Sequence, residues 1–161
     1  PVTNAIALAV SVKESGRTSD KESSSTAITY WSDDLFTQVG VQSSSAISTN
    51  AKPGFLVYGP YLSLPAGSYR LQVLGHLGFA TKPTDPDKQA SIGMLDVSAQ
   101  FGVKTIASMP LQESTSNIAQ LDFQLERDTH DVEFRIQVGA NVQGQVTGYR
   151  LERLSSLQET K

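Results

Sequence analysis

Apolar and polar residues alternate along several short stretches of the chain, and a period of two is typical of half-buried β-strands. In residues 69–74, for example, Tyr69, Leu71 and Val73 would share one face. The other stretches that we expect to be strands are 5–12, 27–31, 95–99, 103–107, 121–125, 132–138 and 149–151. No window has a convincing helical period, so the pattern predicts an all-β antiparallel sandwich or barrel. Small and β-branched residues on the alternating faces favour two packed sheets, an antiparallel β-sandwich.

Glycine and proline mark a corner and a turn in the middle of the chain. Pro60 cannot donate a ladder hydrogen bond and Gly59 tolerates unusual dihedral angles, so we expect a strand to break or bulge there. Leu64-Pro-Ala-Gly67 has the residues of a tight turn. The polar segments 13–26 and 81–88 are expected to be loops, and the strand pattern pauses at 75–78.

A length of 161 residues suits one domain, and neither an internal repeat nor a linker divides the chain. We therefore predict a single β-sandwich domain over residues 1–161. The chain begins with Pro1 rather than methionine, which suggests a piece excised from a larger protein. On that interpretation the compartment depends on the rest of that protein.

Composition and charge argue against several classes of function. The chain has no cysteine, which removes disulfides, thiolate metal sites and cysteine nucleophiles. Its formal net charge of −3, with acids and bases interspersed, argues against sequence-independent binding to nucleic acid phosphates. No run approaches the length of an apolar membrane span. The glycines of 139–148 match neither nucleotide-binding pattern, so no cofactor is expected.

The strongest candidate binding residues surround Trp31, the sole tryptophan. Tyr30 precedes it, and Asp33 and Asp34 follow. Pyranose rings present C–H faces that pack on aromatic rings, while carboxylates accept hydroxyl protons, so these four residues could form a carbohydrate site. In the alternative interpretation Trp31 caps the core at a strand end. That alternative is favoured, because large aromatic residues usually serve packing.

The remaining candidates carry less chemistry. Tyr58 and Tyr61 flank the Gly59–Pro60 corner, where they could face a ligand or, as we prefer, hold the corner. Neither His76 nor His130 belongs to a zinc motif, and no Gly-x-Ser-x-Gly elbow supports a triad. Acidic pairs could bind calcium, but none has the spacing of a known calcium loop, so no metal is predicted. These pairs are 33–34, 85 with 87, and 128 with 131.

The run Gly54-Phe-Leu-Val-Tyr-Gly-Pro-Tyr61, with the following Leu64-Pro-Ala-Gly67 turn, resembles a bacterial β-sandwich module. The resemblance extends over roughly residues 36–154 and includes Val132-Glu-Phe-Arg-Ile-Gln-Val138. Such modules are appended to glycosyltransferases, and sometimes methyltransferases, of surface-polysaccharide biosynthesis. The resemblance implies a non-catalytic, carbohydrate-binding-like jelly roll, cytoplasmic if it is attached to such an enzyme. It supplies no binding residues, and any site would lie in loops 13–36, 75–90 and 139–145.

Three functions remain open at this point. The leading hypothesis is an accessory module, not an enzyme, that binds a glycan or positions a partner enzyme on one. The second is a structural module that joins other domains of the parent protein or forms a homo-oligomer, with Leu74 or Leu77 exposed on a polar face. The weakest is a hydrolase or lyase, since no nucleophile–base or metal constellation stands out in the sequence.

Overall fold

A computed structural model describes residues 26–84 and 91–154. The strand expected over 5–12 and the acids Asp85 and Asp87 lie outside the described residues. The strands are β1 (Thr26–Trp31), β2 (Val41–Gln42), β3 (Ile47–Ser48), β4 (Gly54–Val57), β5 (Pro60–Leu64), β6 (Gly67–Phe79), β7 (Gly93–Ala99), β8 (Lys104–Leu111), β9 (Asn117–Leu125), β10 (Thr129–Val138) and β11 (Val142–Arg153). A 3₁₀ turn, η3 (Ser32–Asp34), follows β1.

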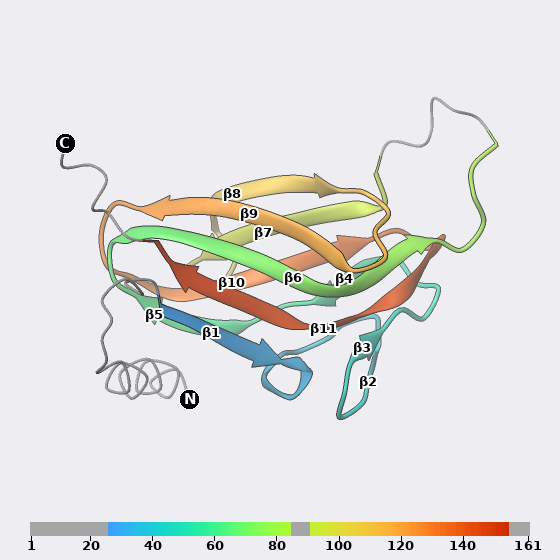
Figure 1. The fold of residues 1–161 in the computed structure, drawn as a ribbon, viewed down its shortest axis with the longest axis horizontal. Coiled ribbons are helices and arrows are strands. Elements are labelled where there is room, and N and C mark those ends of the chain that lie inside the picture. Colours follow the sequence, from blue (N-terminus) through green and yellow to red (C-terminus); the bar gives the residue numbers. More distant parts are fainter. Residues whose placement is uncertain (1–25, 85–90, 155–161) are drawn as a thin grey trace.

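The strands form two antiparallel sheets that lie one over the other (Figure 1). The six-stranded sheet has the order β2-β3-β11-β6-β9, and β1 also pairs with β11. The five-stranded sheet has the order β4-β10-β7-β8, and β5 also pairs with β10. This arrangement confirms the predicted all-β antiparallel sandwich.

The core lies between the two sheets and is built from the apolar positions of the alternating pattern. Leu71 and Val73 of β6 and Phe134 and Ile136 of β10 are completely buried there. The Tyr149 ring of β11 meets Phe134 edge-on at 5.4 Å between centroids, and its hydroxyl donates to the Phe134 carbonyl oxygen at 3.1 Å. A buried phenol therefore has the hydrogen bond that it needs.

The predicted corner at Gly59–Pro60 interrupts an edge strand. β4 ends at Val57 and β5 begins at Pro60, and both pair with β10 in registers that shift along it. The turn predicted at Leu64–Gly67 joins β5 to β6, and the Tyr69 hydroxyl donates to the Pro65 carbonyl oxygen at 2.6 Å across it. Tyr69 therefore closes this turn, a role that the sequence had suggested for a tyrosine at the preceding corner.

The structure corrects two expectations about β6 and one about β8. The strand does not pause at 75–78, because β6 continues to Phe79 through a register shift opposite Val146 and Gly148. Leu77 is buried rather than exposed, because it faces the core while its backbone pairs with Ser114. Val103 is exposed and lies before β8, which begins at Lys104. In the described residues no helix is both long and apolar enough to cross a membrane.

Candidate functional site

The residues predicted around Trp31 separate into two environments. Tyr30 is 6% exposed and belongs to the core, whereas Trp31 is 55% exposed. Successive side chains of a strand point to opposite faces, so both rings of a pair such as Tyr30 and Trp31 cannot line one site. Burial, then the negative charge of Asp34, raises the pKa of Tyr30 to about 12. Tyr30 is therefore not available to a sugar, and the interpretation of Trp31 as a core residue is wrong.

The two aspartates follow Trp31 in η3 and are both exposed. The Trp31 backbone N–H donates to Asp34 Oδ2 at 3.3 Å, so this carboxylate turns back toward the tryptophan's own backbone. The indole lies over Gly148 of β11, with Cε3 3.3 Å from the position that a Cβ would take there. The structure thus brings together Trp31 and Asp34, while Asp33 has no described contact with either.

A second set of aromatic side chains, Phe36, Tyr58, Tyr61 and Phe101, forms a continuous row along one border of the five-stranded sheet. Phe36 stacks on Tyr58 with centroids 5.5 Å apart and lies 6.1 Å from Tyr61. Tyr61 in turn lies 6.0 Å from Phe101. Phe36 is 46% exposed and Phe101 is 74% exposed, and the two tyrosines are half-buried. We call these four residues the aromatic row.

The broken edge strand and the chain that crosses from the other sheet bring the row together. After η3, Phe36 pairs with Tyr58 through reciprocal backbone hydrogen bonds of 3.0 Å. The Phe36 ring then packs over Gly59, where a Cβ would lie 2.8 Å from Cδ2 and where φ is +99°. Glycine is required there for both reasons. The break therefore makes room for an aromatic ring between Tyr58 and Tyr61.

Two members of the row have backbone conformations that bulky residues rarely adopt. Tyr61 has a φ of 72°, and Phe101, in the turn between β7 and β8, has a φ of 56°. Gln100 and Gly102 beside it are also left-handed, with φ values of 57° and 87°. The left-handed region costs a non-glycine residue about 1–2 kcal/mol, and such residues cluster at functional sites. The outliers thus mark this border as a candidate site.

A charged cluster of Asp96, Glu133 and Arg135 lies on the outer face of the same sheet. Glu133 and Arg135 alternate along β10 with the core residues Phe134 and Ile136, which directs them outward. Arg135 donates from Nε and Nη2 to the two oxygens of Asp96, at 2.9 Å each. Ser98 Oγ donates to Asp96 Oδ1 at 3.0 Å. Asp96 is therefore held from two sides.

The aromatic and charged groups contact one another. The Arg135 guanidinium lies 5.0 Å from the centroid of the Phe55 ring, within cation–π range. Glu133 is only 4% exposed, and this burial raises the pKa of its carboxyl, although the charge of Arg135 and a hydrogen bond with Tyr61 oppose the shift. Burial also raises the pKa of Tyr61, and the charge of Glu133 adds to the effect. Tyr61 therefore links the aromatic row to the charged cluster.

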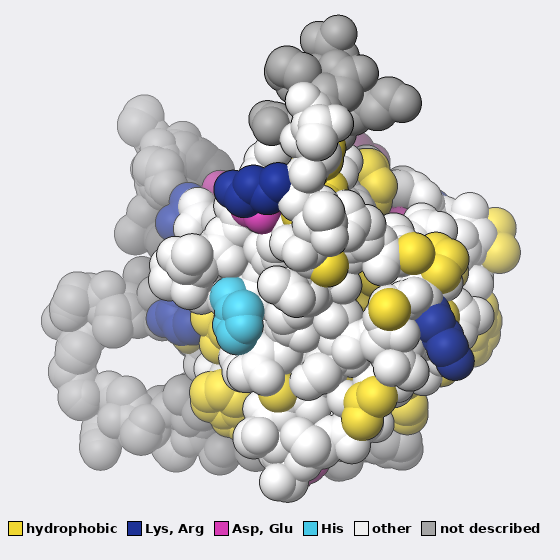
Figure 2. Space-filling model, turned by 90° about the vertical axis from the view of Figure 1, so that its right-hand side faces the viewer, with side chains coloured by type: hydrophobic (Ala, Val, Ile, Leu, Met, Phe, Trp, Pro, Cys, Tyr) yellow, Lys and Arg dark blue, Asp and Glu magenta, His cyan; other side chains and the backbone are white. Residues whose placement is uncertain are grey.

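An open hollow of about 690 Å³ lies at another place, where the end of β6 meets the start of β11 and the connection between β8 and β9. This end of the sandwich, on the right of Figure 1, shows few charged side chains and only scattered hydrophobic ones (Figure 2). Glu113 accepts from the Phe79 backbone N–H at 2.9 Å and pairs with Lys82 at 3.4 Å. These contacts, the backbone hydrogen bond first, lower the pKa of Glu113.

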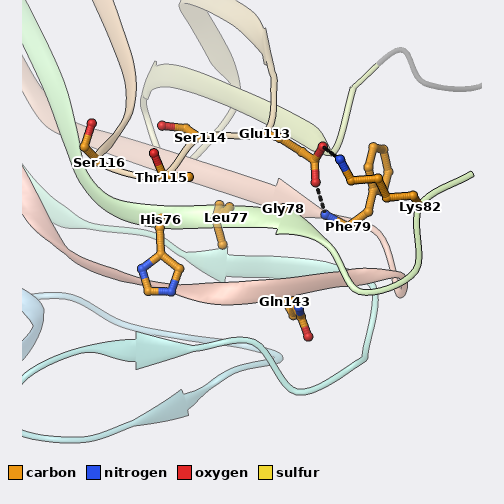
Figure 3. Close-up of a pocket in the computed structure, with 10 residues that line it drawn as sticks. All are labelled: His76, Leu77, Gly78, Phe79, Lys82, Glu113, Ser114, Thr115, Ser116 and Gln143. Carbon is orange, nitrogen blue, oxygen red and sulfur yellow. Dashed lines mark hydrogen bonds and ion pairs between the residues drawn. The ribbon is translucent and has the colours of Figure 1, made fainter.

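The polar side chains that line the hollow do not converge on one point. In Figure 3, His76 and Gln143 point away from the hydroxyls of Ser114 and Ser116 rather than toward one centre. Glu113 and Lys82 are turned to each other (Figure 3). A sugar ring would find only Phe79 as an aromatic surface there, and this residue is half-buried. The aromatic row is the stronger candidate because its four rings are contiguous and two of them, Phe36 and Phe101, are exposed.

The other polar candidates are engaged in local contacts. His130 Nδ1 lies 2.9 Å from Ser63 Oγ, and Asp128 Oδ1 accepts from the Ala66 backbone N–H at 2.9 Å. Within residues 26–84 and 91–154, no group of three or more histidine, aspartate and glutamate side chains is arranged to hold a metal ion.

No family model and no curated protein matches the chain in sequence. Among solved structures it is similar to the C-terminal family 6 carbohydrate-binding module of the laminarinase LamC from Zobellia galactanivorans, with 8% identity, a TM-score of 0.49 and coverage of 78% of this chain and 98% of that one. A family 6 module of lichenase 5A from Cellvibrio mixtus, solved with cellotriose, has 12% identity, a TM-score of 0.42 and coverage of 80% and 98%. A family 35 module from Cellvibrio japonicus has 14% identity, a TM-score of 0.44 and coverage of 80% and 97%.

These similarities are too low to carry an argument, with TM-scores below 0.5. The fold assignment therefore rests on the two sheets of this chain, and the functional argument rests on its side chains. None of the three comparisons bears on an attachment to glycosyltransferases or methyltransferases.

Sequence reasoning missed the aromatic row as a unit, although it singled out Tyr58 and Tyr61. Both tyrosines are half-buried and contact Phe36, and the Tyr61 hydroxyl bonds to Glu133, which pairs with Pro60 of the corner. That a tyrosine holds the corner stays a prediction. One feature of the sequence could have indicated Phe101. This residue lies with Gln100 and Gly102 between two stretches expected to be strands, in a connection where a large apolar side chain does not contribute to the core. No pattern in the sequence shows that Phe101 meets Tyr61.

Proposed function

We propose that this chain is a non-catalytic carbohydrate-binding module whose aromatic row stacks on the rings of a glycan. The observation that carries the proposal is the contiguous row of Phe36, Tyr58, Tyr61 and Phe101, with centroid separations of 5.5–6.1 Å. Contiguous rings offer successive platforms for the C–H faces of a sugar chain.

The charged cluster beside the row supplies polar groups for sugar hydroxyls. Arg135 Nη1, which makes no described hydrogen bond, can donate to a sugar hydroxyl. Glu133 is too buried to contact the sugar itself. Both oxygens of Asp96 are already bonded to Arg135, and one also to Ser98, so Asp96 is poorly placed to donate a proton to a leaving group. The proposal therefore assigns binding to this surface and no catalytic residue.

Binding can be tested by affinity electrophoresis on a panel of bacterial and plant polysaccharides, followed by calorimetry with oligosaccharides. For any ligand found, Phe101→Ala and Tyr61→Ala should each raise Kd by about tenfold or more, since a lost ring stack and its buried area reach about 1.4 kcal/mol. Val41→Ala, which shortens an exposed apolar side chain on the other sheet, should leave Kd unchanged. Ligands that bind both row variants as tightly as the unaltered chain would refute the assignment.

Trp31 is a second proposed contact for the same glycan class. Its exposed indole over Gly148 and the nearby carboxylates of Asp33 and Asp34 have the chemistry of a sugar platform, without Tyr30. Trp31→Ala should weaken binding if the glycan reaches the end of β1. An unchanged Kd for this variant would remove Trp31 from the site and leave the aromatic row in place.

The rival function is a structural module that joins domains or subunits and binds no sugar. Its support is the exposed apolar side chains of this sheet, which include Phe101 and Val103 in the turn before β8 and Met94 at the start of β7. A dimer through this surface should bury at least about 1,000 Å² and survive dilution in sedimentation. A stable dimer with silent glycan titrations would favour the rival. Attached to a polysaccharide-biosynthesis enzyme, the proposed carbohydrate-binding module would position that enzyme on its glycan.

A further inference from the structure

The charges of the five-stranded sheet have an excess of acid. Its strands contribute three carboxylates and two basic side chains, apart from His130: Asp96, Asp131, Glu133, Lys104 and Arg135. Three of these, Asp96, Glu133 and Arg135, form the cluster beside the aromatic row. The cluster itself has two carboxylates and one guanidinium.

The one guanidinium in the cluster is already neutralised. Arg135 uses Nε and Nη2 in a bidentate pair with Asp96, with side chains about one-fifth exposed (20% and 19%). A bidentate pair with an additional cation–π contact is rigid and well oriented. An anionic ligand would have to compete with Asp96 for this cation.

Glu133 is the carboxylate left without such a partner. Its side chain is buried under the outer face, where it hydrogen-bonds to the Tyr61 hydroxyl and feels the charges of Arg135 and Asp96. A carboxylate or sulfate on a glycan stacked on Tyr61 would meet a cluster of net negative charge whose guanidinium is already paired with Asp96.

We propose that the aromatic row accepts glycans without anionic groups and that Glu133 excludes glycans that carry uronate or sulfate. This inference rests on the proposed function, because it names the class of sugar for the same surface. A neutral chain brings no charge near Glu133, whereas a uronate or sulfate places a second negative charge there.

The test uses neutral β-glucan, mannan and galactan together with derivatives of each in which the primary alcohols are oxidised to carboxylates. We expect a neutral polysaccharide to bind and its oxidised derivative to bind about tenfold more weakly at 0.01 M salt, where the screening length is about 30 Å. This difference in Kd between the oxidised and neutral polysaccharides, the gap, should narrow at about 0.15 M salt, where the screening length is about 8 Å. Glu133→Gln should narrow the gap at low salt.

Asp122→Asn is the matched control, since it removes one exposed carboxylate from the six-stranded sheet and should leave the gap unchanged. Oxidation also removes a hydroxyl group, and that loss alone can weaken binding. If the difference in Kd between the neutral and oxidised polysaccharides persists undiminished in Glu133→Gln and at higher salt, the charge of Glu133 is not its cause and the inference is overturned. An oxidised chain that binds as well as its neutral parent, and loses affinity with Tyr61→Ala, would overturn it too while leaving the proposed function intact. If no polysaccharide of either kind binds, the proposed function fails first.

Discussion

At the scale of single residues, position in the strand decides what a side chain can do. Tyr30 and Trp31 are neighbours in sequence, but Tyr30 is buried and Trp31 is exposed. The predicted cluster assigned both rings to one site, although strand geometry places them on opposite faces. The same alternation directs Glu133 and Arg135 of β10 away from the core that Phe134 and Ile136 enter.

Glu133 should make stability depend on pH. Burial raises the pKa of its carboxyl above the ordinary value of 4.5, so between the two values the folded chain binds more protons than the unfolded chain. The free energy of unfolding contributed by this group therefore falls as pH rises from about 4.5 through the raised pKa. Glu133→Gln should gain stability relative to the unaltered chain on going from about pH 4 to about pH 7, as measured by urea unfolding.

Asp122 is the control with the opposite sign. The hydrogen bond from Arg70 lowers the pKa of Asp122, so its contribution is present above the ordinary value of 3.8 and is lost as pH falls below it. Asp122→Asn should therefore lower the free energy of unfolding slightly near neutral pH, and this destabilisation should disappear at low pH. The same trend with pH in both variants would contradict the environment described for Glu133.

At the scale of elements, breaks in strands organise the molecule. The interruption between β4 and β5 admits Phe36 over Gly59, and the turn between β7 and β8 presents Phe101. The Gly59–Pro60 corner was predicted because proline lacks a donor, and that local chemistry suffices. The segment that fills the corner could not be predicted, since Phe36 comes from the crossing after β1.

The register shift between β6 and β11 gives a prediction at this scale. Gly75 has a φ of +131°, and a Cβ there would lie 2.3 Å from the Gln145 carbonyl oxygen. Gly75→Ala should lower the free energy of unfolding by about 2–4 kcal/mol, because both the dihedral angle and the neighbouring backbone resist it. Gly139→Ala, where nothing lies within 4 Å, should change it by less than about 0.5 kcal/mol. Equal free energies of unfolding for the two variants would show that the register shift does not require glycine at position 75.

At the scale of the whole molecule, a ligand of the aromatic row should stabilise the sandwich. A glycan that binds only the folded chain adds about 2.7 kcal/mol to the free energy of unfolding at a concentration 100 times its Kd. We expect this gain in urea unfolding for a neutral oligosaccharide, and a smaller gain for Phe101→Ala at the same concentration. A gain that is equal in both would place the glycan elsewhere, with the hollow near Glu113 and Lys82 as the next candidate.

The sequence by itself determined most of the long strands and their inward faces, because the period of two is a local property of the chain. It did not predict the short strands β2 and β3, and it assigned Val103 to the wrong environment. Leu71, Val73, Phe134 and Ile136 are buried where the pattern places them. It also determined the corner at Gly59–Pro60, since the two residues restrict their own backbone. Only the tertiary structure decided the candidate site. Phe36, Tyr61 and Phe101 come from a crossing segment, an edge strand and a hairpin turn, and they meet because the pairing of strands distant in sequence brings these elements together.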